Sequence, residues 1–178
     1  MVIIMALRTI LTSEEPALYK KSREITKFDA RIHQLVDDMK ETLLKSGGVG
    51  LAAPQVGVLR RAVVVLETNV DNEDEEYVIE LLNPEILEVE GEQEGPEGCL
   101  SEPKKYGIVK RPMNVKVRAQ DRNGEWFEYD GEGLTARCFC HEIDHLEGIM
   151  FTSKVERMLT DEEIKELTAE EEKEKEEK

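Results

Sequence analysis

The chain has 178 residues, a length that suits one domain with a hydrophobic core and is short for two. Its formal net charge of -16 leaves no basic stripe along the sequence that could replace counterions on a phosphate backbone, so we expect no direct nucleic-acid binding and no attachment to an acidic membrane. The 3 cysteines, in a chain without a secretory segment, favour reduced thiols over a disulfide framework.

The chain begins with an apolar run, Val2 to Leu7, which resembles the apolar part of a signal peptide. No basic region precedes it, and Arg8 ends it. No later stretch approaches the roughly 20 apolar residues needed to cross a bilayer. We therefore expect a cytoplasmic protein without a membrane anchor.

The first strongly periodic segment, Phe28 to Ser46, predicts a helix. Its apolar residues recur at helical spacing, and Gly47 can close the helix in a left-handed conformation. The following segment, Gly47 to Gly57, has too many glycines for a stable helix and predicts a loop. That loop feeds a β-branched strand, Arg61 to Leu66.

The middle of the chain predicts short strands. Residues 70–76 are polar and acidic and indicate an exposed turn, after which two strands, Tyr77 to Leu82 and Ile86 to Val89, are separated by Asn83-Pro84. Alternation is clearest in Met113 to Ala119. Asn123-Gly124 then predicts a hairpin turn into a further strand at 126–129.

The last part of the chain predicts two helices. Gly133 to Leu146 is an apolar helical segment that Gly148 can end, and residues 161–178 are almost all Glu and Lys, which indicates a solvated helix. Short strands with helices at either end, without alternating strands and helices, predict a single-domain α+β fold in which mostly antiparallel strands surround the helix at 133–146.

That helix carries the motif HEIDH at 141–145. His141 and His145 are four residues apart, so both imidazoles lie on one face of a helix and can bind one metal ion. Glu142 follows the first of them, where a base that acts on metal-activated water is needed. The apolar surroundings of the motif argue against a solvated helix that carries it by chance.

Hydrolytic metal sites usually have three protein ligands, and the third is open to several candidates. In the metzincin pattern, the third ligand is a histidine six residues after the second one. That position is occupied by Phe151. A downstream carboxylate would have to come from the charged tail, from Glu162, Glu163 or Glu166. Cys99 is the better candidate, because it lies in a compact turn-like segment between strands. Cys138, three residues before His141, is a rival.

Three segments together resemble the peptide deformylase family: GVGLAAPQ at 48–55, EGCLS at 97–101 and HEIDH at 141–145. They occur in the family's order within one domain. The resemblance implies removal of the formyl group from the N-terminal formyl-methionine of new polypeptides, with release of formate. It also implies a bacterial-type cytoplasmic enzyme, with residues 1–160 as a catalytic metallohydrolase domain and 161–178 as an acidic tail.

The resemblance implies roles for named residues. Cys99, His141 and His145 would hold a divalent metal ion, and Glu142 would move the proton between water and the leaving nitrogen. The Gln55 side-chain amide and the Leu100 backbone N–H would stabilise the oxyanion. Substrate binding is assigned to Gly48, Val49, Gly50, Glu97, Leu134 and Cys138. An ion pair between Asp144 and Arg111 is expected to support the site.

The expected cofactor is ferrous iron, with zinc, nickel or cobalt as alternatives, because the ligands suit several metals. The expected partners are nascent formyl-methionyl polypeptides close to the ribosome, and the expected state is a monomer. The rival enzyme is an HExxH metallopeptidase with a carboxylate ligand. A further alternative is a structural metal module whose acidic tail binds a basic partner.

Overall fold

In the computed structural model, which describes residues 6–70 and 76–176, the strands form two antiparallel sheets. The larger has the order β1-β2-β3-β6-β7, with bounds Gly50–Ala52, Ala62–Glu67, Tyr77–Glu90, Asn114–Gln120 and Trp126–Glu132. The smaller has the order β4-β5-β8, with bounds Gln93–Cys99, Glu102–Arg111 and Arg157–Met158. With α1 (Ala30–Ser46), α2 (Leu134–Leu146) and α3 (Asp161–Glu176), the described residues form the predicted single-domain α+β fold.

Helix α1 forms where the periodicity predicted it, and its ends have identifiable causes. The Oδ1 atom of Asp29 accepts hydrogen bonds from the backbone N–H groups of Arg31 (3.0 Å) and Ile32 (3.3 Å), so Asp29 caps the helix. The helix therefore starts at Ala30 and not at Phe28. Gly47, with φ 73°, ends it in the left-handed conformation.

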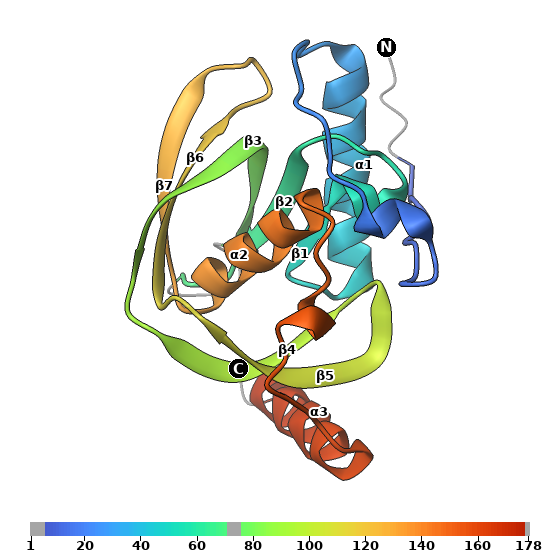
Figure 1. The fold of residues 1–178 in the computed structure, drawn as a ribbon, viewed down its shortest axis with the longest axis vertical. Coiled ribbons are helices and arrows are strands. Elements are labelled where there is room, and N and C mark those ends of the chain that lie inside the picture. Colours follow the sequence, from blue (N-terminus) through green and yellow to red (C-terminus); the bar gives the residue numbers. More distant parts are fainter. Residues whose placement is uncertain (1–5, 71–75, 177–178) are drawn as a thin grey trace.

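Strand β2 separates two hydrophobic cores, because its successive side chains point to opposite faces of the sheet. Val63 and Val65 belong to the core on the side of α2, whereas Ala62 and Val64 belong to the core on the side of α1. Figure 1 shows α2 enclosed between the curved larger sheet and the β4-β5 hairpin, with α1 outside the sheet. Helix α2 is thus the central element of the domain.

The predicted loop at Gly47–Gly57 is wrong in its middle. Residues 50–52 form β1, which pairs with β2, and Ala53–Val56 forms a 3-10 helix, η2. The side chain of Gln55 accepts a hydrogen bond from the Ala52 backbone N–H at 2.9 Å, which closes this turn. The segment is therefore held by a side-chain hydrogen bond within a short 3-10 helix, and it does not form a longer helix.

The two strands predicted on either side of Asn83-Pro84 form one strand, β3, which crosses both residues. Asn83 adopts φ 48°, and its side chain binds both the N–H and the C=O of Ile25, each at 2.8 Å. The register against β6 shifts at this point, so the irregularity is absorbed as a bulge instead of ending the strand. The predicted hairpin at Asn123-Gly124 is confirmed, since it joins β6 to β7.

Two sequence expectations fall on residues that the structure does not describe. The exposed turn at 70–76 lies almost wholly outside the described ranges, as does most of the apolar run Val2–Leu7. Over residues 6–70 and 76–176, no helix is both long and apolar enough to cross a membrane.

Candidate metal centre

Three ligand atoms meet beside helix α2. The Nε2 atoms of His141 and His145 are 3.2 Å apart, and the Sγ atom of Cys99 lies 3.3 Å from Nε2 of His145. Both histidines are on α2, one turn apart, and Cys99 ends strand β4. Within the described part of the chain, these three residues form the group of His, Cys, Asp or Glu side chains that could hold a metal ion.

The donor set suits a tetrahedral metal site. Metal–nitrogen bonds of about 2.0–2.1 Å and a metal–sulfur bond of about 2.3 Å imply ligand atoms roughly 3.3–3.6 Å apart. The observed separations of 3.2 and 3.3 Å are close to this. Three protein ligands are usual in catalytic metal sites, so an ion held by these two imidazole nitrogens and one sulfur would keep a position for water or substrate.

The rival third ligands lie elsewhere. Phe151 stacks against the ring of His141 with centroids 6.0 Å apart, and its side chain has no ligand atom. Glu163 binds the side chain of Arg157 at 2.9 Å on the surface. Cys138 is buried in the neighbouring cavity but does not belong to the ligand group, and burial raises the pKa of its thiol far above the usual value.

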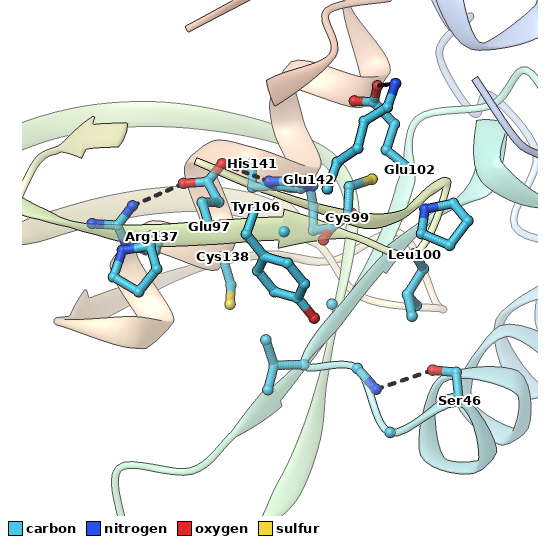
Figure 2. Close-up of a pocket in the computed structure, with 18 of the residues that line it drawn as sticks. Ser46, Glu97, Cys99, Leu100, Glu102, Tyr106, Arg137, Cys138, His141 and Glu142 are labelled. Atoms are coloured by element: carbon cyan, nitrogen blue, oxygen red, sulfur yellow. Dashed lines mark hydrogen bonds and ion pairs between the residues drawn. The ribbon is translucent and has the colours of Figure 1, made fainter. Parts of the chain in front are cut away.

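A buried carboxylate holds His141 in place. Glu97 Oε1 is 2.7 Å from His141 Nδ1, which directs Nε2 toward Cys99 and His145. Arg111 binds both oxygens of Glu97, at 2.6 and 3.1 Å. Arg137 binds Oε2 at 2.9 Å, and Figure 2 shows this pair beside His141. Burial alone raises the pKa of Glu97, but the bonds with His141 and Arg111 outweigh it and hold that pKa well below its usual range.

The expected ion pair of Asp144 with Arg111 is confirmed, at 2.7 Å. Asp144 also binds Lys154 at 3.1 Å. One guanidinium therefore links Glu97 on β4 to Asp144 on α2. This fixes the helix that carries both histidines relative to the strand that carries Cys99.

Glu142 lies in the cavity with one oxygen that has no partner. It is 4% exposed, and its Oε2 atom is buried without a hydrogen bond to any described residue. Burial is the largest cause that raises its pKa, to about 7, against the opposing charge of His141. A Cβ added at Gly50 would overlap the side chain of Glu142, so glycine at this position lets the carboxyl keep its place.

Gln55 is fully buried and its amide is oriented by three contacts. Its Oε1 accepts from Ala52, so the Nε2 group points the other way, to Ser101 Oγ at 3.2 Å and Cys99 Sγ at 3.6 Å. An amide N–H group is therefore fixed next to the ligand cluster.

The cavity beside the cluster has a volume of about 600 Å³. All the residues predicted to bind substrate line it: Gly48, Val49, Gly50, Glu97, Leu134 and Cys138. Leu134 is 47% exposed at its mouth, and Gly48 is so close to Leu100 that an added Cβ would meet Leu100 Cδ1 at 2.9 Å. The carboxylate of Glu97 is already occupied by protein groups, so its side chain has no free oxygen for a substrate.

Several residues at the site were not predicted from the sequence. Arg137 precedes His141 by one helical turn and is buried. An arginine within an apolar helical segment could have indicated a buried ion pair. Ser101, which binds Gln55, lies within the EGCLS segment but had no assigned role. Tyr106, which points into the cavity (Figure 2), and Leu167 on α3 also line it and were not predicted.

Comparison with known proteins agrees with this geometry. The family profile described as Polypeptide deformylase matches residues 7–161. A peptide deformylase of Caldicellulosiruptor bescii is 54% identical over 160 residues, which cover 90% of this chain and 92% of the relative. Peptide deformylase 1 of Bacillus subtilis is 45% identical and covers 92% and 99%.

Solved structures are also similar. The peptide deformylase of Thermotoga maritima superposes with a TM-score of 0.77 at 36% identity, covering 84% of this chain and 98% of that one. The Met-Ala-Ser-bound class I type b peptide deformylase of Acinetobacter baumannii gives 0.77 at 33% identity, covering 85% and 100%. The chain therefore belongs to the polypeptide deformylase family, hydrolases that remove N-formyl groups.

Proposed function

We propose that this chain removes the formyl group from the N-terminal formyl-methionine of polypeptides by metal-dependent hydrolysis. Water and the formyl amide are consumed, and formate and a free amine are produced. The observation that carries the proposal is the convergence of Cys99, His141 and His145 beside the buried carboxyl of Glu142.

Cys99, His141 and His145 would hold a divalent ion, which when bound supplies Lewis-acid activation of water and of the formyl carbonyl. Ferrous iron is the proposed native metal. Zinc, nickel and cobalt suit the same mixed sulfur and nitrogen ligands. Glu97 keeps His141 in the required orientation through Nδ1.

Glu142 is the proposed acid and base of the reaction. A pKa of about 7 lets its carboxyl both accept and donate a proton near neutral pH. Its buried Oε2 atom has no competing partner among the described residues, so it is available to the attacking water. The carboxyl takes the proton of that water and returns it to the leaving nitrogen.

Gln55 and Leu100 are the proposed donors to the oxyanion that develops on the formyl oxygen. The Gln55 amide is fixed before substrate arrives, by Ala52 and Ser101, so its orientation costs nothing during the reaction. The Leu100 backbone N–H follows directly after the ligand Cys99. Loss of one such donor typically lowers the rate about 10²- to 10³-fold.

The peptide is proposed to bind as an added strand. Strands β1 and β4 are edges of the two sheets, and both border the cavity through Gly50 and Gly98. An extended chain between two edges can use their unpaired backbone groups, which gives binding with little dependence on sequence. Val49, Leu134 and Cys138 are the proposed apolar wall around the methionine side chain, and the Met-Ala-Ser-bound relative supports methionine as the first residue.

The proposed substrates are nascent formyl-methionyl polypeptides in the bacterial cytoplasm, close to the ribosome, and the proposed acting state is a monomer. The bacterial relatives support this setting.

The test is formate release from formyl-Met-Ala-Ser by protein loaded anaerobically with ferrous iron, beside the unformylated peptide. Stoichiometric formate and free amine, without peptide-bond cleavage, is the expected result. Cleavage of the peptide bond without formate would favour the HExxH metallopeptidase. A chain that binds metal tightly but has neither activity would be a structural metal module.

A further inference from the structure

A second cavity, of about 550 Å³, lies at the opposite end of α1 from the metal centre. Its lining includes Arg31 and Ile32 in the first turn of α1, whereas Ser46 and Gly47 at the other end of that helix line the first cavity. A helix of 17 residues is about 25 Å long, and the two cavities share no lining residue. The second cavity is therefore a separate site.

The second cavity is basic, on a chain whose net charge is -16. Its charged lining consists of five cations and two carboxylates: Arg8, Arg23, Lys27, Arg31, Arg60, Glu24 and Asp29. Arg8 is paired with Asp38 at 2.9 Å. Asp29 caps α1 through Oδ1 and keeps its negative charge at the edge of the cavity. The other four cations have no ion pair with any residue in the described ranges, so they outnumber the two carboxylates of the lining, Glu24 and Asp29.

Arg23 and Arg60 are placed where their charges repel. They are partners in a parallel β-bridge, which sets their side chains next to each other on one side of the backbone. Like charges directly opposite across a strand pair are destabilising. Arg23 is exposed and Arg60 half-buried, so water relieves the repulsion only in part.

Arg31 adds a second unfavourable charge. It lies in the first turn of α1, next to the N-cap carboxylate of Asp29, which accepts its backbone N–H. The turn itself contains no acidic residue, and a cation there opposes the positive end of the helix dipole. An anion in the cavity would relieve both this repulsion and that between Arg23 and Arg60. The Arg23–Arg60 pair and the position of Arg31 therefore both favour the binding of an anion in this cavity.

We propose that this cavity binds a ligand with two or more adjacent phosphate groups. Three of the four unpaired cations are arginines, whose planar guanidinium groups bind phosphate oxygens through paired hydrogen bonds. Ile25 and Leu35, both buried, form part of an apolar floor that accepts the uncharged part of such a ligand. One phosphate would leave several cations unmatched, and adjacent phosphates match them.

Adjacent phosphates occur in nucleoside triphosphates and along an RNA strand, and separate titrations distinguish these sources. The titrants are inorganic tripolyphosphate, a nucleoside triphosphate and a short single-stranded RNA, each added to the ¹⁵N-labelled protein at low ionic strength. The expected result is saturable binding of tripolyphosphate, with amide shifts at residues 23–31 and 58–60. Tighter binding of the nucleotide or of the RNA than of tripolyphosphate would identify the natural source of the phosphates.

The variant that tests the site is Arg23→Ala/Arg60→Ala. It should weaken tripolyphosphate binding by roughly ten- to a hundredfold, the range expected when a hydrogen bond to a charged group is lost. Lys27→Ala/Arg31→Ala is a second variant on the other segment and should also weaken binding. The matched control is Lys110→Ala/Arg157→Ala, which removes two exposed cations on the smaller sheet.

Equal binding by the site variants and the control, or no saturable binding of any of the three titrants, would overturn the proposal. Formate release should be the same in all these variants, because none of the changed residues lines the metal-centre cavity. The result is therefore independent of the proposed deformylation.

Discussion

The Nδ1 atom of His141 lies 2.7 Å from Oε1 of Glu97, and both side chains are buried. Because Nδ1 is occupied in this way, the lone pair of Nε2 faces the other two ligand atoms. Arg111 and Arg137 both bind the carboxylate of Glu97. The orientation of His141 on α2 therefore depends on strand β4 of the smaller sheet.

Replacement of that carboxylate should weaken metal binding. Glu97→Gln keeps the shape but removes the charge that binds His141, so we expect about 10- to 100-fold lower metal affinity. Competition with a chromogenic chelator measures this. Glu94→Gln, an exposed change on the same strand, is the control and should keep the original affinity. Unchanged affinity in Glu97→Gln would mean that His141 is oriented by the helix alone.

Cys99→Ala should abolish stoichiometric metal binding, because it removes one of three ligands. The loss should exceed the roughly 10- to 100-fold effect of an outer partner such as Glu97. Cys140→Ala removes a buried thiol outside the ligand group and is the control. Metal content per chain, measured after gel filtration, checks the prediction, and full occupancy in Cys99→Ala would make the assigned ligand set wrong.

Glu142→Gln should separate metal binding from catalysis. The amide has nearly the same shape but cannot take up a proton, so kcat should fall by roughly 10²- to 10⁴-fold while metal content is retained. Glu147→Gln, near the end of the same helix, should leave kcat unchanged. The measurements are formate release under saturating substrate and metal content. A Glu142→Gln variant with normal kcat would need another base.

Gly50→Ala should impair the reaction through a clash. The new Cβ would overlap Oε1 of Glu142, so either the carboxyl or strand β1 has to move. A misplacement of about 1 Å can cost about 10²-fold in rate. Gly95→Ala is the control, since its Cβ would be 3.5 Å from Arg137, an ordinary contact. The measurement is the rate of formate release. An equal rate in Gly50→Ala and Gly95→Ala would contradict the prediction.

Glu67 should make stability depend on pH. Burial alone raises its pKa, but hydrogen bonds from Thr135, Asn69 and Tyr129 outweigh burial and lower the pKa. A lowered pKa in the folded state means that the stabilisation is complete above the unfolded-state pKa and is lost as the pH falls through the folded-state pKa. Glu67→Gln should therefore cost ~1–3 kcal/mol at pH 7, and less in acid.

Urea unfolding at pH 7 and at successively lower pH measures the difference between the original chain and Glu67→Gln. Glu128→Gln, exposed on β7, is the control and should show little difference at any pH. A difference that grows as the pH falls would contradict the direction of the pKa shift.

Local patterns were enough for the regular elements. The periodicity of 28–46 and 133–146 predicted α1 and α2 to within two residues at each end, because helix formation depends on neighbours three and four positions away. Asn123-Gly124 predicted its hairpin because the conformation of a two-residue turn depends on those two residues. Strand β1 and the continuous β3 were missed, because Gly50 pairs with Val65 and Asn83 binds Ile25, partners that are distant in sequence.

By itself, the sequence determined that His141 and His145 share one face of a helix, and three ordered motifs were sufficient to indicate the family. Only the tertiary structure decided that Cys99 lies 3.3 Å from His145 and that the carboxylate of Glu97 serves His141. It also brought Arg23 and Arg60 together on an acidic chain. The physical reason is that helical neighbours are fixed by local backbone geometry, whereas these pairs meet only when sheet register and packing bring distant segments together.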